Sequence, residues 1–220
     1  NIAHELRTPV SSIRGYIETL LEQPHITPDK QHFFLERTRS QNVRLSDLIR
    51  DIALITKTEE ASELFDKEQV NVHNTLQEVI NDLHSPIVAH GINVKNEINP
   101  QTVIEGNKTL VYAIFRNLIE NSINYAGDHI SIGVNNYMED KEFYYFSYYD
   151  TGQGIEENHL NRIFERFYRV CEGRSRQNGG SGLGLSIVKN AVLFHKGDIS
   201  AKNRKDGGLE FLFSLKKTLF

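Results

Sequence analysis

Apolar side chains recur at helical spacing through the first part of the chain. They lie three or four residues apart, at Ile2, Leu6, Val10, Ile13, Ile17 and Leu20. This spacing predicts a helix with one apolar stripe. Residues 24–28 interrupt the pattern, and Thr27 before Pro28 is a typical pair of N-cap and first-turn residues. A second helix is therefore predicted to run from Pro28 to about Thr58.

The second helix carries a short apolar seam of its own, at Leu45, Leu48, Ile52 and Ile55. Two helices with one apolar stripe each cannot enclose a core by themselves. A second copy of the hairpin would cover both stripes in a four-helix bundle about a two-fold axis, which predicts a homodimer. Packing of the hairpin on the rest of the chain would cover them as well, so the stripes leave both arrangements open.

A charged stretch at residues 59–63 predicts a boundary that divides the chain into domains 1–60 and 61–220. Beyond it the periodicity alternates between helix and strand, which predicts an α+β sandwich with helices on one face of a mixed sheet. Helices are expected at 72–87, where Pro86 ends or kinks the helix, at 110–125 and at 183–195, and strands at 92–98, at 130–134, at 142–150 and on both sides of residues 207–208.

Composition narrows the functional classes. With 39% hydrophobic and 25% charged residues, the 220-residue chain is typical of a globular protein. A formal net charge of −4 argues against nucleic acid or a membrane surface as the partner. One cysteine excludes an intramolecular disulfide and a CxxC metal site. The chain begins with Asn1, and no apolar run is long enough to span a bilayer, so we expect a fragment of a longer protein without membrane contacts of its own.

His4 lies off the apolar stripe of the first helix. At 100° per residue it points roughly 155° away from the stripe centre, toward solvent, with Thr8 near the same direction one turn later. Glu5 is its neighbour in sequence. A carboxylate that accepts a proton from one ring nitrogen leaves the other nitrogen as a nucleophile. A surface histidine beside a glutamate is usually only solvated, so this pair alone is weak evidence.

Two later segments suit a nucleotide and its metal ion. Asn117, Glu120, Asn121 and Asn124 share one polar face of a predicted helix, and amide or carboxylate oxygens grouped in this way suit Mg²⁺. Asp150 ends an aromatic strand just before a glycine turn. Its carboxylate could accept a hydrogen bond from the amino group of a base, while the glycines allow the backbone to approach a ligand.

Two further segments suit phosphates. Residues 160–178 contain five arginines and no lysine, and guanidinium groups match the geometry of phosphate oxygens. The run from Gly179 to Leu185 contains four glycines and leads directly into a helix, whose first N–H groups can bind phosphate. It is neither a Walker A loop, because the GxxxxGK[ST] pattern is absent, nor a Rossmann fingerprint, because no strand precedes it.

The string from Asn1 to Pro9, which reads NIAHELRTP, resembles the phospho-acceptor box of sensor histidine kinases. The four later segments resemble, in order, the asparagine, first glycine, phenylalanine and second glycine boxes of their catalytic domain. That resemblance implies the ATP-binding sandwich fold shared with gyrase B, the heat-shock chaperone ATPases and the MutL-type repair ATPases, known as the GHKL or Bergerat fold. It covers essentially the whole chain.

The resemblance implies a role for each matching residue. His4 would be phosphorylated, Glu5 would act as general base, and Thr8 would position a water that dephosphorylates the partner. Asn121 would bind Mg²⁺, and Asp150 would bind the adenine amino group. The full set implied to hold ATP is Asn117, Asn121, Asn124, Tyr125, Asp150, Gly152, Gly154, Ile155, Phe164, Arg166, Tyr168, Arg169, Gly180, Ser181, Gly182, Leu183, Gly184 and Leu185.

The implied activity is ATP-dependent autophosphorylation of a histidine, followed by transfer to an aspartate on the receiver domain of a response regulator and by regulator phosphatase activity. The resemblance also implies a homodimer and a cytoplasmic part of an inner-membrane sensor protein. Asn124 departs from the family, which usually has a lysine there, and Arg166 could compensate. A dimer-closing ATPase of the same superfamily and a non-catalytic adaptor with a dead nucleotide site stay as rival interpretations. Acid-labile label on the protein would exclude the first, and magnesium-dependent ATP binding would exclude the second.

Overall fold

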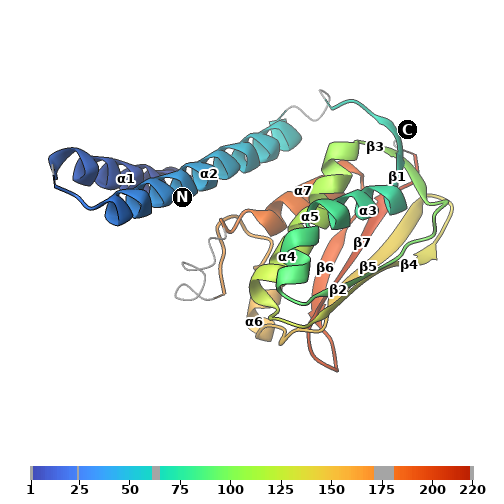
Figure 1. Ribbon diagram of the computed structural model, residues 1–220. Coiled ribbons are helices and arrows are strands. Elements are labelled where there is room, and N and C mark those ends of the chain that lie inside the picture. The colour runs from blue at the N-terminus through green and yellow to red at the C-terminus, as the bar shows by residue number, and fades with distance from the viewer. Residues whose placement is uncertain (1, 24, 61–64, 171–180, 219–220) are drawn as a thin grey trace. The chain divides into compact units, whose positions relative to one another are not determined.

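The computed structural model describes residues 2–23, 25–60, 65–170 and 181–218 (Figure 1). The chain forms two compact units, Asn1–Leu54 and Ile55–Phe220, and each is described by itself. The predicted boundary after residue 60 lies a few residues beyond this division, at the end of the second helix.

The first unit is a helical hairpin made of α1 (Ile2–Glu22) and the greater part of α2 (Pro28–Glu60). Both helices begin and end close to the predicted positions. The rings of Tyr16 and Phe34 lie 5.8 Å apart, and Glu5 forms an ion pair with Arg44 across 4.0 Å. The later residue of α1 meets the earlier residue of α2, and the earlier residue of α1 meets the later one, so the two helices run antiparallel.

The hairpin leaves many large apolar side chains exposed, among them Val10, Ile17, Leu21, Phe33, Leu35, Val43 and Ile49. Leu21 keeps 79% of its accessible surface. Burying apolar surface is worth roughly 25 cal/mol per Å², so these residues favour an arrangement in which something covers them.

In the second unit, the single helix predicted for residues 72–87 is two helices, α3 (Val72–Asp82) and α4 (His84–Ala89). Pro86 lies in the first turn of α4. A proline ring clashes with the carbonyl group four residues before it, which here belongs to Asp82, the last residue of α3. The proline therefore ends the first helix upstream of its own position.

The main sheet has five strands in the order β2-β4-β5-β7-β6. Its strands are β2 (Asn93–Glu97), β4 (Ser131–Glu139), β5 (Phe143–Asp150), β7 (Leu209–Lys216) and β6 (Ile199–Asn203). β2 pairs with β4 in parallel, and the other neighbours pair antiparallel, so the predicted mixed sheet is confirmed.

Helices cover one face of this sheet, as Figure 1 shows. They are α3, α5 (Lys108–Tyr125) and α7 (Gly184–Phe194), while the short α6 (Glu157–Leu160) follows β5 in the chain. Between sheet and helices, the stacked rings of Phe146 and Phe213 lie 5.2 Å apart, and Phe115 of α5 contacts Phe213 edge-on. This core fixes the helix that carries the asparagines against the strand that carries Asp150.

Sequence analysis missed a second, two-stranded sheet, in which β1 (Glu68–Asn71) pairs antiparallel with β3 (Val103–Gly106). Each strand has only four residues, and the ladder places Val70 opposite Ile104. Strands this short show too few alternations for their period to be recognised.

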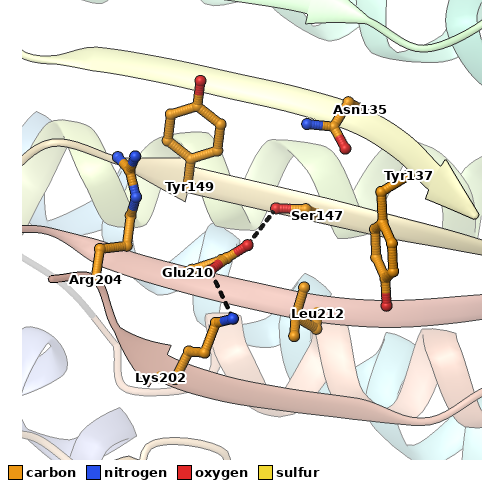
Figure 2. A pocket seen from close by; sticks show the side chains of 8 residues that line it. All are labelled: Asn135, Tyr137, Ser147, Tyr149, Lys202, Arg204, Glu210 and Leu212. Atoms are coloured by element: carbon orange, nitrogen blue, oxygen red, sulfur yellow. Dashed lines mark hydrogen bonds and ion pairs between the residues drawn. The ribbon is translucent and has the colours of Figure 1, made fainter.

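The other face of the main sheet carries a shallow groove of about 440 Å³ (Figure 2). Figure 2 shows the side chains of Ser147 and Lys202 reaching the carboxylate of Glu210 from both sides. Its lining consists of Asn135, Tyr137, Ser147, Tyr149, Lys202, Arg204, Glu210 and Leu212. None of the residues predicted to hold ATP lines it, so this groove is separate from the candidate nucleotide site.

Candidate functional site

His4 is exposed on α1, as its helical phase predicts. Its side chain keeps 73% of its accessible surface, and Nδ1 lies 3.8 Å from Oε1 of Glu5. The carboxylate lies on the Nδ1 side, which leaves Nε2 toward solvent. Thr8 lies one turn later, and its Oγ1 donates a hydrogen bond to the carbonyl oxygen of His4 at 3.2 Å.

Arg44 of α2 is a residue of this site that sequence analysis missed. Its Nη2 lies 4.0 Å from Oε2 of Glu5, while Oε1 of the same carboxylate faces His4. The glutamate is therefore held between the imidazole and a guanidinium group. Because Arg44 lies 39 positions after Glu5 in the sequence, only the hairpin geometry brings them together.

Helix α5 presents the four polar residues predicted for metal and nucleotide. Asn117 is held by its own helix, because its Nδ2 donates to the carbonyl oxygen of Ala113 at 2.8 Å. Glu120 is engaged by Arg116 at 2.9 Å. The half-buried Asn121 makes no side-chain hydrogen bond to any described residue, and its amide can serve a ligand. Asn124 is half-buried, and Tyr125, the last residue of the helix, is exposed.

Asp150 is the most deeply buried polar side chain among the predicted ligand-binding residues, with 2% of its surface exposed. Its Oδ1 accepts hydrogen bonds from the backbone N–H groups of Gly152 at 2.9 Å and Leu209 at 3.3 Å. Its Oδ2 accepts one from Oγ of Ser122 at 3.1 Å. Buried polar groups are normally satisfied in this way, and here the donors also fix the direction of the carboxylate.

The turn after β5 is shaped by its two glycines. A Cβ at position 152 would lie 2.5 Å from the carbonyl oxygen of Ala126, so only glycine permits this approach to the end of α5. Gly154 has φ of +70°, a conformation that favours glycine. The side chain of Asn203 accepts from the N–H of Ile155 at 3.0 Å and donates to its carbonyl oxygen at 2.6 Å, which holds the turn on β6.

The aromatic and arginine residues after α6 are anchored in different ways. The ring of Phe164 packs edge-on against Phe211 of β7 at 6.2 Å. Tyr168 hydrogen-bonds to His159 at 2.5 Å through its hydroxyl group. Arg166 donates to Glu59, so the predicted compensation for Asn124 would require this guanidinium to leave a carboxylate. Arg169 is half-buried.

The second glycine segment meets both neighbouring segments. A Cβ at position 184 would lie 2.8 Å from Oδ1 of Asn117, so Gly184 opens α7 directly against α5. Gly182 has φ of +71°, and its carbonyl oxygen accepts from the N–H of Phe167 at 2.8 Å. Ser181 accepts from the N–H of Leu183 at 3.2 Å. Leu183 is buried and Leu185 is half-buried, while Gly180 lies outside the described residues.

Three supporting residues were missed in this unit, namely Ser122, Tyr148 and Asn203. Ser122 had a readable signal, since it falls three and four positions after the apolar residues Ile119 and Leu118. A hydroxyl group on the apolar face of a helix indicates a buried hydrogen bond.

The donor set fits a magnesium ion better than a transition metal. The described residues contain no group of three or more histidine, cysteine, aspartate or glutamate side chains that could hold a metal. Asn121, one turn after the Asn117 that meets Gly184, offers an amide oxygen that no described side chain engages. Magnesium commonly takes one or two protein oxygens and completes its shell with water and phosphate.

Comparison with known proteins finds two families along the chain. Residues 106–219 match the family described as histidine kinase-, DNA gyrase B- and HSP90-like ATPase. Residues 1–61 match the His Kinase A (phospho-acceptor) domain.

Individual relatives agree with this pattern. The chain is 31% identical over 211 residues to the phosphate regulon sensor protein PhoR of Pseudomonas aeruginosa, covering 96% of this chain and 47% of that protein. It is 32% identical over 219 residues to the sensor histidine kinase WalK of Bacillus subtilis, covering 98% and 35%. The chain thus spans half or less of the length of these relatives.

Among solved structures, the histidine kinase ThkA in complex with the response regulator protein TrrA is similar in fold, with a TM-score of 0.75 and 23% identity, covering 99% of this chain and 60% of that one. No helix in the described part of the chain is both long and apolar enough to cross a membrane. The location at an inner membrane stays a prediction.

Proposed function

Because this chain belongs to the sensor histidine kinase family, with a phospho-acceptor domain followed by an ATPase domain of the gyrase B and HSP90 type, we propose that it transfers the γ-phosphoryl group of ATP to its own His4. One observation carries this proposal. An exposed imidazole with a carboxylate at its Nδ1 lies on a helical hairpin, and a separate unit holds a buried carboxylate beside a helix of asparagines.

Nucleotide recognition is assigned to the end of β5. Asp150 would accept a hydrogen bond from the adenine amino group, and the N–H of Gly152, packed against the end of α5, helps to hold that carboxylate in place. Asn117, Asn121 and the glycine segment before α7 would hold the phosphates, since the N-terminus of a helix favours negative charge. A magnesium ion held by Asn121 would neutralise phosphate charge.

In the transfer step, the lone pair on Nε2 of His4 would form a bond to the γ-phosphorus. The bond from that phosphorus to the bridging oxygen would break, and ADP would leave with the electron pair. The Nδ1 proton of the resulting cationic ring would pass toward Glu5, whose Oε1 lies 3.8 Å away. Transfer between well-placed groups needs mainly positioning and charge neutralisation.

The phosphoryl group would then move to an aspartate of a receiver domain, as the complex of the similar kinase ThkA with a response regulator supports. Thr8, exposed one turn after His4, would position the water for the reverse reaction, dephosphorylation of the regulator. The exposed apolar residues of both helices support a homodimeric four-helix bundle. The end of α2 and the match of residues 1–61 to the phospho-acceptor domain support a domain boundary after residue 60.

The test is incubation with γ-labelled ATP and Mg²⁺, followed by localisation of the phosphate by mass spectrometry. Acid-labile and base-stable label on His4 is expected. His4→Ala should incorporate no label yet bind ATP with unchanged affinity, whereas the exposed His32 on α2 supplies a matched control, His32→Ala, that should label normally. Label on the His4→Ala protein equal to that of the wild type would refute the assignment.

A further inference from the structure

Two buried hydroxyl groups lie behind the carboxylate of Asp150. Oγ of Ser122, on α5, is 3.1 Å from Oδ2 of Asp150 and 2.9 Å from the hydroxyl oxygen of Tyr148. The hydroxyl of Tyr148 also reaches the carbonyl oxygen of Leu118 at 3.0 Å. Ser122 and Tyr148 have no exposed surface, so water does not compete for these bonds.

The two carboxylate oxygens differ in how much accepting capacity they have left. Oδ1 already accepts from two backbone N–H groups, those of Gly152 and Leu209. Among the residues that the structure describes, only Ser122 donates to Oδ2. A carboxylate offers about four acceptor sites in total, roughly two on each oxygen. Oδ2 is therefore the oxygen that can still receive a hydrogen bond from a ligand.

The hydrogen of the Tyr148 hydroxyl group determines what the hydrogen of Ser122 can do. Burial raises the pKa of Tyr148 well above its ordinary value, against the opposing hydrogen bond with Ser122 and with a smaller contribution from the charge of Asp150, so its hydroxyl group stays protonated. That single hydrogen serves the Leu118 carbonyl or the Ser122 oxygen. The hydrogen of Ser122 is then free to go to Asp150, where a charged acceptor makes the stronger bond.

We propose that Ser122, supported by Tyr148, is a positioning residue that aims Oδ2 of Asp150 at the amino group of adenine. The inference rests on the proposed function, in which Asp150 binds that amino group. Ser122 itself does not touch the ligand. Its contribution is to hold one lone pair of Oδ2 in the direction of the base while its own bond occupies the other.

This role affects one contact of the nucleotide and leaves the others alone. In the proposed function, phosphate binding depends on other residues, namely Asn117, Asn121 and the glycine segment before α7. Purine riboside triphosphate is ATP without the 6-amino group, so the ratio of its dissociation constant to that of ATP reports on the Asp150 contact. A site built to hydrogen-bond a ligand group discriminates strongly against a ligand that lacks it.

The experiment measures the binding of both nucleotides, with Mg²⁺, to the full chain and to Ser122→Ala. ATP affinity is expected to fall about tenfold, the loss of roughly one hydrogen bond, while affinity for the analogue stays within about twofold. Tyr148→Phe is the second variant, and it should cause a smaller loss of the same selective kind. Circular dichroism and the urea midpoint establish that each variant is folded.

The chain contains a matched control on the same strand. Ser147 is also buried, and its Oγ donates to the carboxylate of Glu210 at 2.8 Å, but it points to the opposite face of the sheet (Figure 2). Ser147→Ala therefore removes the same kind of bond from the same element. It should leave both nucleotide affinities unchanged.

The outcomes distinguish a failure of the role proposed for Ser122 from a failure of the role proposed for Asp150. If the wild type prefers ATP and Asp150→Asn abolishes that preference, Asp150 has its proposed role. If Ser122→Ala and Tyr148→Phe then keep the full preference, or weaken both nucleotides by the same factor, Ser122 has only a structural role and the inference is overturned. If the wild type itself does not distinguish the two nucleotides, the assignment of Asp150 and the inference fail together.

Discussion

The hairpin and the ATP-binding unit use histidine in opposite ways. His4 keeps 73% of its side-chain surface exposed, and its partner Glu5 is its neighbour in sequence. His195 has no exposed surface, and its ring joins the backbone of Asn107, 88 positions earlier, to that of Ala191. The hairpin presents its imidazole to solvent, whereas the second unit encloses that of His195 and uses it to fix geometry. A site such as His4 with Glu5 can be recognised from neighbouring residues in the sequence. A site such as His195 with Asn107 can be recognised only once the fold is known.

Substitutions in the two units should therefore have different effects on stability and on binding. The pairs of Glu5 with His4 and Arg44 are long, 3.8 and 4.0 Å, and loose ion pairs contribute little to stability, about 0–1 kcal/mol, so changes near His4 should alter reactivity more than the fold. Polar groups buried in the second unit carry a desolvation cost when a partner is removed, so changes there should alter both stability and binding.

The largest effect is expected from Glu5→Gln. The amide can no longer take the Nδ1 proton, so phosphorylation of His4 should slow roughly 100-fold, the lower end of the range for general-base catalysis. ATP affinity should not change, and the urea midpoint should fall only slightly, because the amide oxygen can still face Arg44. The rate is measured from single-turnover labelling with γ-labelled ATP.

Glu18→Gln supplies the control, because Glu18 is an exposed glutamate of the same helix and pairs with Arg14 at 3.6 Å. It should label at the wild-type rate. Equal slowing in both variants would mean that the loss of negative charge on α1, rather than a proton acceptor at His4, explains the effect.

The second prediction concerns pH and the buried histidine. Burial lowers the pKa of His195 to about 4, from an ordinary value of 6.5. Between pH 6.5 and 4 the unfolded state therefore binds a proton at His195 that the folded state does not bind. The free energy of unfolding falls as the pH drops through this window. Full stability is present above about pH 6.5, and about 3 kcal/mol is lost by pH 4. Urea unfolding of the second unit at several pH values measures this slope.

His195→Gln tests the source of the slope. The glutamine oxygen can accept from the N–H of Asn107 in place of Nε2, but the amide does not titrate. The variant should be less stable at neutral pH and should lose most of the slope between pH 6.5 and 4. A slope identical to that of the wild type would assign the pH dependence to other groups.

The elements that repeat a period over several turns could be predicted from sequence, and α1, α2 and α5 show this. Short elements and breaks could not, because they depend on particular clashes and on tertiary pairing. The proline at 86 was recognised, yet the helix ends at Asp82, since the ring acts on the preceding carbonyl group.

The candidate site divides in the same way. The box around His4 and the glycine positions could be proposed from the sequence because their spacing is local. Ser122 and Arg44 were not, because each acts on a residue that is distant in sequence, Asp150 and Glu5 respectively. Arg166 was expected at the phosphates, but the side chain bonds to Glu59, and no local pattern indicates that partner.

The third prediction concerns the meeting point of α5 and α7. A Cβ at position 184 would lie 2.8 Å from Oδ1 of Asn117, so Gly184→Ala should displace this amide and weaken ATP binding about tenfold. Combining it with Asn117→Ala decides the mechanism, because the two effects should not add if both act through the same side chain. Additive losses in ATP affinity would show that Gly184 acts independently of Asn117.

The smallest effect is expected from a substitution in the hairpin, Gly15→Ala. Gly15 lies in the interior of α1, and a Cβ there would meet nothing within 4 Å. Glycine in a helix costs roughly 0.5–1 kcal/mol relative to alanine, so Gly15→Ala should raise the stability of the hairpin by that amount, measured by thermal unfolding. The sign also tests the proposed dimer. A gain that persists at concentrations where the protein is dimeric leaves Gly15 outside the interface, whereas a loss that appears only in the dimer would place the partner's backbone against this glycine.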